Sequence, residues 1–367
     1  MQTLMKANAA LLFAGLATFI LMGAGQSLYG PALPAFSRSF GIDVRDAGLM
    51  ISAHWVGCLI GVSAMFAFGA RITPRHALAL MGLGMAGIAL LAGWGLTVIG
   101  AVVFGVGYGC ATAVFNPRML RAFGARGPAM LSLLNATFGL GAIAAPLVFV
   151  WLGNNPQTTF AIVTALCLLV WLASGPAGST APVAEVGQTA PFRPHWGILA
   201  FGMVAIGMEA CLIGLGPTAL IRAGATETEA AELLSAFFAA FLLARVVLIF
   251  TAHLIGSFTL YTGAMAVAAV CSAGAALISP PLFFVALGVC AGLFFPGYYV
   301  TASRKMGEDL RVPPTILLSG LVGGILSPLL LPSVLDGMGD RGFFWLMAVV
   351  SGALTLAALV MTRSLNR

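Results

Sequence analysis

Charged side chains are scarce in this sequence. Lysine, arginine, aspartate and glutamate make up 8% of its 367 residues, against roughly a quarter of an ordinary soluble domain. Hydrophobic residues make up 60%, and the mean hydropathy is +1.04. A chain with so little polar surface cannot cover an apolar core in water. The composition therefore excludes a soluble globular protein and predicts a polytopic membrane protein.

Several patterns that carry chemistry are also missing. There is no Walker loop for ATP, no CxxC pair, and no histidine at HxxxH or HxxxD spacing. The 16 methionines are scattered, which favours packing over Cu(I) transport. No stripe of basic residues suits nucleic acid, although the net charge is +6. We expect no cofactor, metal centre, nucleic-acid partner or enzymatic activity, and the longest connection, about twenty residues, is too short for a sensor domain.

The apolar stretches predict twelve transmembrane helices, which at about 20 residues each use roughly 240 residues. A polar stretch at 176–196, rich in Pro, Ala, Gly, Ser and Thr, divides the helices into six plus six. The predicted fold is an all-α membrane protein with an N-terminal six-helix bundle (1–175), a cytoplasmic linker (176–196) and a C-terminal six-helix bundle (197–367). The helices are expected near 9–31, 46–70, 76–95, 97–118, 128–152, 158–175, 197–221, 230–252, 257–278, 281–303, 313–335 and 342–362.

The distribution of charge predicts the orientation of these helices. With the N-terminus inside, 13 of the 17 basic residues fall in inner segments, and most acidic residues fall in outer loops. The positive-inside rule then places both termini in the cytoplasm. We expect a monomer that crosses the cell (inner) membrane repeatedly and has the lipid bilayer as its surroundings.

Two segments suggest internal duplication. GAGQSLYGPALP at 23–34 and GMEACLIGLGPTAL at 207–220 stand at equivalent points of the two halves, and each carries a Gly-Pro pair. Each is expected to end a helix near the outer surface. Such paired breaks are typical of transporters built from repeats.

Two titratable residues are candidates for proton coupling. Glu209 lies about twelve residues into its predicted helix, hence near the bilayer midplane, where an ionised carboxylate is expensive unless it faces water or a cation. The alternative for Glu209 is a protonated group that links helices. His54 titrates near physiological pH and could relay protons, or it could be a neutral histidine bonded to a neighbouring hydroxyl.

Other polar residues within the helices are candidates for a solute cavity. Gln26 and Tyr29 lie one turn apart in a glycine-rich helix and could bond a polar solute or a neighbouring helix. Asn116 and Asn135 lie near inner helix ends, where a structural cap beside Pro117 is the favoured interpretation. Tyr298 belongs to an aromatic run that could stack on a solute or form packing surface.

Four arginines are predicted to form a cytoplasmic gate. They lie at or near the inner ends of helices, where they can pair with carbonyl groups or lipid headgroups. They are Arg71, Arg75, Arg118 and Arg245.

Several of these patterns together resemble the major facilitator superfamily. They are Asn116-Pro117, the segment NATFGLGAIAAPLV at 135–148, the basic loop GARITPR at 69–75, and Arg245. The first two look like the fucose-permease-like sugar branch. The resemblance implies two bundles that rock around a central site. The basic loop lacks the family's usual aspartate.

The departures from the sugar branch bear on function. That branch carries an acid four residues before the Asn-Pro pair, where this chain has Thr112, and another acid in its first helix, where this chain offers Gln26, Ser27 and Tyr29. We expect a secondary transporter of a small organic solute, proton-coupled through Glu209 and working by alternating access. A drug or metabolite efflux antiporter is the alternative, since GLGAIAAP echoes a motif of drug antiporters. Glu209, Gln26 and either Asn116 or Tyr298 are expected to face a common cavity.

Overall fold

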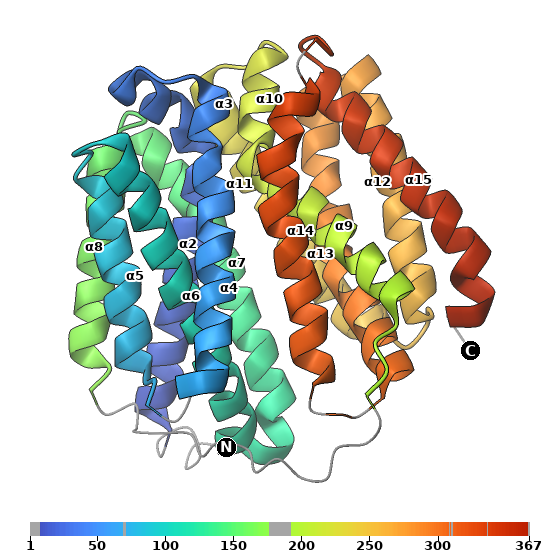
Figure 1. Ribbon diagram of the computed structural model, residues 1–367, viewed down its shortest axis with the longest axis horizontal. Coiled ribbons are helices and arrows are strands. Elements are labelled where there is room, and N and C mark those ends of the chain that lie inside the picture. The colour runs from blue at the N-terminus through green and yellow to red at the C-terminus, as the bar shows by residue number, and fades with distance from the viewer. Residues whose placement is uncertain are drawn as a thin grey trace. The chain divides into compact units, whose positions relative to one another are not determined.

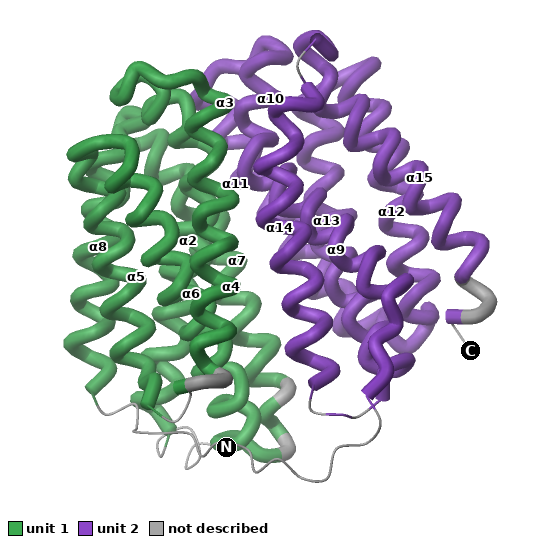
Figure 2. The backbone as a smooth tube through the Cα atoms, in the orientation of Figure 1, with its two compact units in different colours: residues 1–184 green, residues 185–367 purple. Residues whose placement is uncertain are grey.

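The computed structural model describes residues 8–68, 71–175, 192–307, 309, 311–335 and 337–365, and every regular element in them is a helix (Figure 1). Five charged residues, Lys6, Glu185, Glu308, Asp336 and Arg367, lie outside the described residues. The chain divides into two compact units, residues 1–184 and 185–367 (Figure 2). The division falls inside the polar stretch 176–196.

Unit 1 is built from long helices that pack pairwise. α6 packs against both α4 and α5, α2 packs against α7, and α5 packs against α8. The elements are α2 (Ala9–Phe40), α3 (Val44–Ala47), α4 (Leu49–Phe68), α5 (Pro74–Ala89), α6 (Trp94–Phe123), the 3-10 turn η1 (Gly124–Arg126), α7 (Gly127–Trp151) and α8 (Pro156–Ala173).

Unit 2 repeats this manner of construction. α9 packs against α14, α12 packs against α13 and α15, and α11 packs against α13. The elements are α9 (Trp196–Gly214), α10 (Gly216–Arg222), α11 (Glu227–Thr251), α12 (Ser257–Leu277), α13 (Pro280–Met306), α14 (Val312–Leu335) and α15 (Gly342–Leu365).

The helices have the length and composition of membrane spans. In the described residues, 11 helical segments are long and apolar enough to cross a bilayer. The remaining predicted span, 76–95, corresponds to α5, which has 16 residues and ends at Ala89. The observed helices agree with an all-α fold of about twelve spans.

The expectation that segment 23–34 ends the first helix is wrong. α2 continues through Pro31 and Pro34 to Phe40. Each proline removes one backbone donor, but the helix stays buried through Phe36 along its packed face, which keeps it intact. A glycine ends it: Gly41 has a φ of 63°, and its N–H donates to the Ser37 carbonyl.

The predicted helix 197–221 is in fact two helices. α9 ends at Gly214 and α10 begins at Gly216, with Pro217 in its first turn. Proline fits a first turn because its missing N–H would have no intrahelical partner there. The second paired segment, 207–220, therefore does contain a helix end, five residues beyond Glu209.

Two glycines allow the helices of unit 1 to approach closely. A Cβ on Gly105 of α6 would collide with the His54 carbonyl oxygen of α4, and one on Gly23 of α2 would collide with the Phe138 carbonyl oxygen of α7. Backbone atoms cannot move aside cheaply. These contacts therefore fix α4 beside α6 and α2 beside α7, which positions the polar residues described next.

Candidate functional site

Gln26 and Tyr108 form a direct link between α2 and α6. The Tyr108 hydroxyl donates to Gln26 Oε1 at 2.9 Å. Gln26 is 7% exposed, whereas Tyr108 is half-buried. Thr112, one turn further along α6, donates its hydroxyl to the Tyr108 carbonyl at 3.1 Å. The structure thus brings Gln26 close to a tyrosine that the sequence argument does not name, while Thr112 bonds its own helix.

His54 lies beside this link, inside a group of aromatic rings. It is 1% exposed, and its ring centroid is 5.1 Å from that of Tyr108 and 5.4 Å from that of Phe104. The Tyr29 hydroxyl lies 3.4 Å from His54 Nδ1, and Cys58 Sγ lies 3.5 Å from Nε2. Both ring nitrogens therefore have a neutral neighbour. These surroundings suit the neutral, hydroxyl-bonded histidine better than a relay.

The two asparagines have different surroundings. Asn116 Oδ1, on α6, is buried without a hydrogen-bond partner. Asn135, on α7, is exposed, and its Nδ2 donates to the Leu131 carbonyl of its own helix at 2.9 Å. The Asn116 acceptor is therefore unpaired, whereas the Asn135 side chain is bonded within its own helix.

Glu209 sits in the apolar helix α9 of unit 2. Its Oε2 is buried and has no hydrogen-bond partner, and the guanidinium of Arg245 attracts its carboxylate electrostatically. Arg245 itself donates from Nε to the Gly292 carbonyl of α13 at 3.2 Å and lies 4.3 Å over the Phe241 ring. Arg245 is therefore held between α11 and α13, with a carboxylate nearby.

Tyr298 of α13 has its hydroxyl fully engaged. It is 1% exposed, donates to the Ile316 carbonyl of α14 at 3.0 Å, and lies 2.6 Å from Ser319 Oγ. Its ring covers Gly202 of α9, where a Cβ would collide with it. These contacts tie three helices of unit 2 together, and a role of Tyr298 in solute binding stays a prediction.

The remaining predicted gate residues lie at helix ends of unit 1. Arg71 and Arg75 are exposed, and the Arg75 guanidinium stacks 4.5 Å over the Trp171 ring near the end of α8. Arg118 is half-buried in the last turns of α6. The role of these three arginines in a cytoplasmic gate stays a prediction.

Unit 2 contains a cavity of about 310 Å³ between α9, α14 and α15. Its walls are apolar apart from Ser327, and Met203, Met208 and Met347 contribute much of the lining. Within the described ranges, no three His, Cys, Asp or Glu side chains are grouped so that they could hold a metal ion.

The sequence profile of the Major Facilitator Superfamily matches residues 15–312. The chain belongs to the Major Facilitator Superfamily. It is accordingly a multi-pass membrane protein of a transporter family. An uncharacterized MFS-type transporter of Yersinia pestis is 23% identical over 163 residues, a match that covers 42% of this chain and 42% of that relative.

Solved structures of superfamily members share the fold. A D-xylose-proton symporter matches with a TM-score of 0.76 and 14% identity over 96% of each chain. The nucleoside transporter NupG matches with a TM-score of 0.76 and 13% identity, covering 96% of this chain and 99% of that one. The E. coli fucose:proton symporter FucP matches with a TM-score of 0.65 and 18% identity, covering 95% and 98%.

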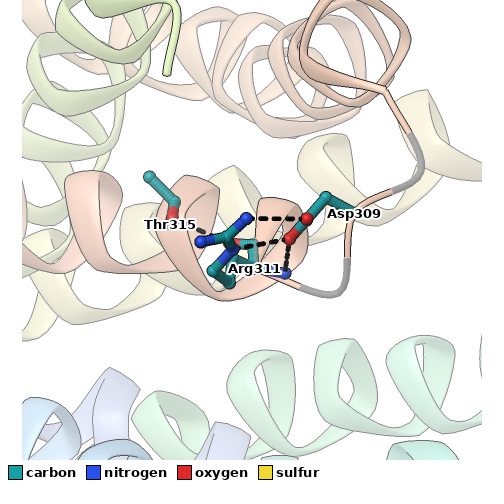
Figure 3. Close-up of polar contacts among 3 residues, drawn as sticks. All are labelled: Asp309, Arg311 and Thr315. Atoms are coloured by element: carbon teal, nitrogen blue, oxygen red, sulfur yellow. Dashed lines mark hydrogen bonds and ion pairs between the residues drawn. The ribbon is translucent and has the colours of Figure 1, made fainter. Parts of the chain in front are cut away.

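This superfamily member also has a polar cluster that the sequence argument missed, between α13 and α14 (Figure 3). Arg311 donates from Nε and Nη2 to the two carboxylate oxygens of Asp309, at 2.8 and 2.9 Å, and its backbone N–H donates to the same carboxylate. Asp309 has only 1% of its side chain exposed. The bonds from Arg311 lower the pKa of Asp309 to about 2.

The same arginine holds the chain that enters α9. The Arg311 guanidinium lies 4.8 Å over the ring of Phe192, four residues before that helix. An Asp and an Arg two positions apart in a connection between helices are common, so their spacing alone does not indicate this cluster. Its partner Phe192 is distant in sequence, and only the fold brings the two together.

Proposed function

We propose that this protein is a secondary active transporter of a small organic solute that works by alternating access and is coupled to protons. The observation that carries the proposal is the Glu209 carboxylate of the apolar helix α9, one oxygen of which is buried without a hydrogen-bond partner. A carboxylate in this position is costly to ionise, so it tends to hold a proton until water or a cation reaches it. Such a group can bind and release a proton as its surroundings change.

Arg245 supports the same assignment. The positive charge of the Arg245 guanidinium acts on the Glu209 carboxylate. Its bond to Gly292 and its contact with Phe241 hold it in place. We therefore assign Glu209 as the proton site and Arg245 as the residue that stabilises its deprotonated form. His54 is the second candidate, weaker because its ring is enclosed by other aromatic rings.

Two of the structural neighbours are proton symporters, which supports proton coupling. The D-xylose-proton symporter and the fucose:proton symporter share the fold. By analogy, we propose that the halves 1–175 and 197–367 rock against each other, joined by a cytoplasmic linker at 176–196. We also propose a monomer in the cell (inner) membrane with both termini in the cytoplasm. Arg71, Arg75 and Arg118 are proposed for its cytoplasmic gate.

Efflux of an apolar compound is the second candidate. The 310 Å³ cavity of unit 2 has apolar walls with three methionines, whose flexible side chains adapt to ligands of different shapes. A drug or metabolite antiporter would expel its substrate as protons enter.

Proton movement in proteoliposomes tests the proposal. Sugars, nucleosides, organic acids and cationic drugs are added under an imposed pH gradient to wild type, Glu209→Gln and a matched control, Glu232→Gln, whose side chain is exposed on α11. We expect flux triggered by one solute class, lost in Glu209→Gln and kept in Glu232→Gln. The sign of the flux separates uptake from export. Flux that persists in Glu209→Gln would transfer the assignment to His54, and no flux with any solute would refute proton coupling.

A further inference from the structure

The Gln26 side chain bonds through its oxygen to a neighbour on α6. An amide can present either its oxygen or its nitrogen to a given direction, because the two ends have nearly the same shape. The Tyr108 hydroxyl donates to Oε1 at 2.9 Å, so the oxygen faces α6. The Nε2 group, with two donor hydrogens, therefore does not bond to Tyr108.

This amide nitrogen is available to a ligand. It has no hydrogen-bond partner within the described part of the chain, and it does not belong to the sealed, unpartnered atoms such as Asn116 Oδ1. An N–H group without a partner in the protein is stabilised by a hydrogen bond to an acceptor oxygen of a ligand. Gln26 therefore presents a neutral donor and no net charge.

The surroundings of the amide are aromatic. Tyr108 lies edge-on to His54 at 5.1 Å and to Phe138 at 6.4 Å, and the Trp55 ring lies 5.4 Å from that of His54. Tyr108, Trp55 and Phe138 are only half-buried. The patch thus combines ring surface, which suits an apolar or C–H-rich face, with one amide donor.

We propose that Gln26 and Tyr108 form a recognition site in unit 1 for a neutral solute that has acceptor oxygens and an apolar face. Tyr108 is the positioning residue: it holds the Gln26 amide so that the nitrogen is presented to the solute. This rests on the proposed function, whose substrate class it narrows. An ionised solute is disfavoured because this patch offers no charge to pair with it.

The test compares solutes that differ by one oxygen. Proteoliposome uptake of D-xylose and uridine is measured beside their deoxy analogues, with benzoate and tetraphenylphosphonium as charged probes. The variants are Tyr108→Phe, Gln26→Glu and a control, Tyr299→Phe, a half-buried tyrosine of unit 2. Gln26→Glu keeps an acceptor for Tyr108 and has no donor once its carboxyl group is ionised. Because a protonated carboxyl group still donates, uptake by this variant is measured across a range of pH. Melting temperatures confirm that each variant is folded.

We expect wild type to prefer one hydroxylated probe over its deoxy analogue. Tyr108→Phe should reduce this preference about three- to tenfold by raising the KM of the hydroxylated probe, with the maximal rate kept. Gln26→Glu should abolish the preference at alkaline pH, where its carboxyl group is ionised, and Tyr299→Phe should keep it.

Three results would overturn the inference. Unchanged discrimination in Tyr108→Phe would remove its positioning role. Transport of a charged probe alone would refute the substrate class and leave the transporter proposal standing. Transport of no probe by any variant would refute this site together with the proposed function.

Discussion

Replacing Tyr298 by phenylalanine should weaken unit 2 only slightly. The change removes a hydroxyl that donates to the Ile316 carbonyl at 3.0 Å. Ser319 Oγ also donates to that carbonyl, at 2.9 Å, so no acceptor is left without a side-chain donor. The expected cost is about 0.6 kcal/mol, typical of a hydrogen bond between membrane helices.

Tyr261 provides the matched comparison. Its hydroxyl donates to the Phe201 carbonyl at 3.0 Å, and in the described residues no second side chain donates there. Tyr261 is 0% exposed. Tyr261→Phe should therefore cost more, up to about 1.7 kcal/mol.

Thermal unfolding in detergent measures both variants. At about 2–4 °C per kcal/mol for a unit of this size, we expect melting temperatures lowered by about 1–3 °C for Tyr298→Phe and by about 3–7 °C for Tyr261→Phe. If the melting temperature of Tyr298→Phe fell as far as that of Tyr261→Phe, Ser319 would not compensate for the lost hydroxyl. A tenfold rise in the transport KM of Tyr298→Phe would instead show that this residue contacts the solute.

Two further predictions follow from the packing and the charges. Gly105→Ala places a methyl group against the His54 carbonyl and should destabilise unit 1 by about 1–3 kcal/mol in thermal melts. The control Gly352→Ala has open space around the added methyl group and should leave stability unchanged. Equal stabilities of the two variants would contradict the close approach of α4 and α6. The Asp309 carboxylate should titrate near pH 2 in a carbonyl NMR titration assigned with Asp309→Asn. The pKa of Asp309 is depressed from about 3.9, so the bond between Asp309 and Arg311 stabilises the folded state above pH 4. This stabilisation is lost as the pH falls through 2. A titration midpoint near pH 4 would contradict the pairing.

The sequence predicts the fold of this chain well because helices in a bilayer are specified locally. Long apolar runs bounded by charges locate the spans, and most observed bounds lie within a few residues of those predicted. The largest errors occur at prolines. Pro31 and Pro34 look like helix ends, but burial against neighbouring helices keeps α2 intact, whereas Pro217 does begin a new helix.

The candidate site was less predictable, because it depends on which helix faces which. An apolar helix with one carboxylate points to Glu209 from sequence alone. Nothing in the spacing pairs Gln26 with Tyr108, which are 82 positions apart, or Arg311 with Phe192. Tyr29 and His54 were both singled out, but their contact with each other follows only from the packing of α2 and α4.

The arginine-aromatic stacks at Trp171 and Phe192 have a practical consequence for handling the protein. Each stack lies within one unit and secures the chain close to where that unit's helices stop or start. We expect a protease site or a fluorescent domain inserted at 176–191, between these two rings, to leave both stacks in place. We expect each half to fold when the two are expressed as separate polypeptides, with Trp171 retained at the end of one and Phe192 at the start of the other.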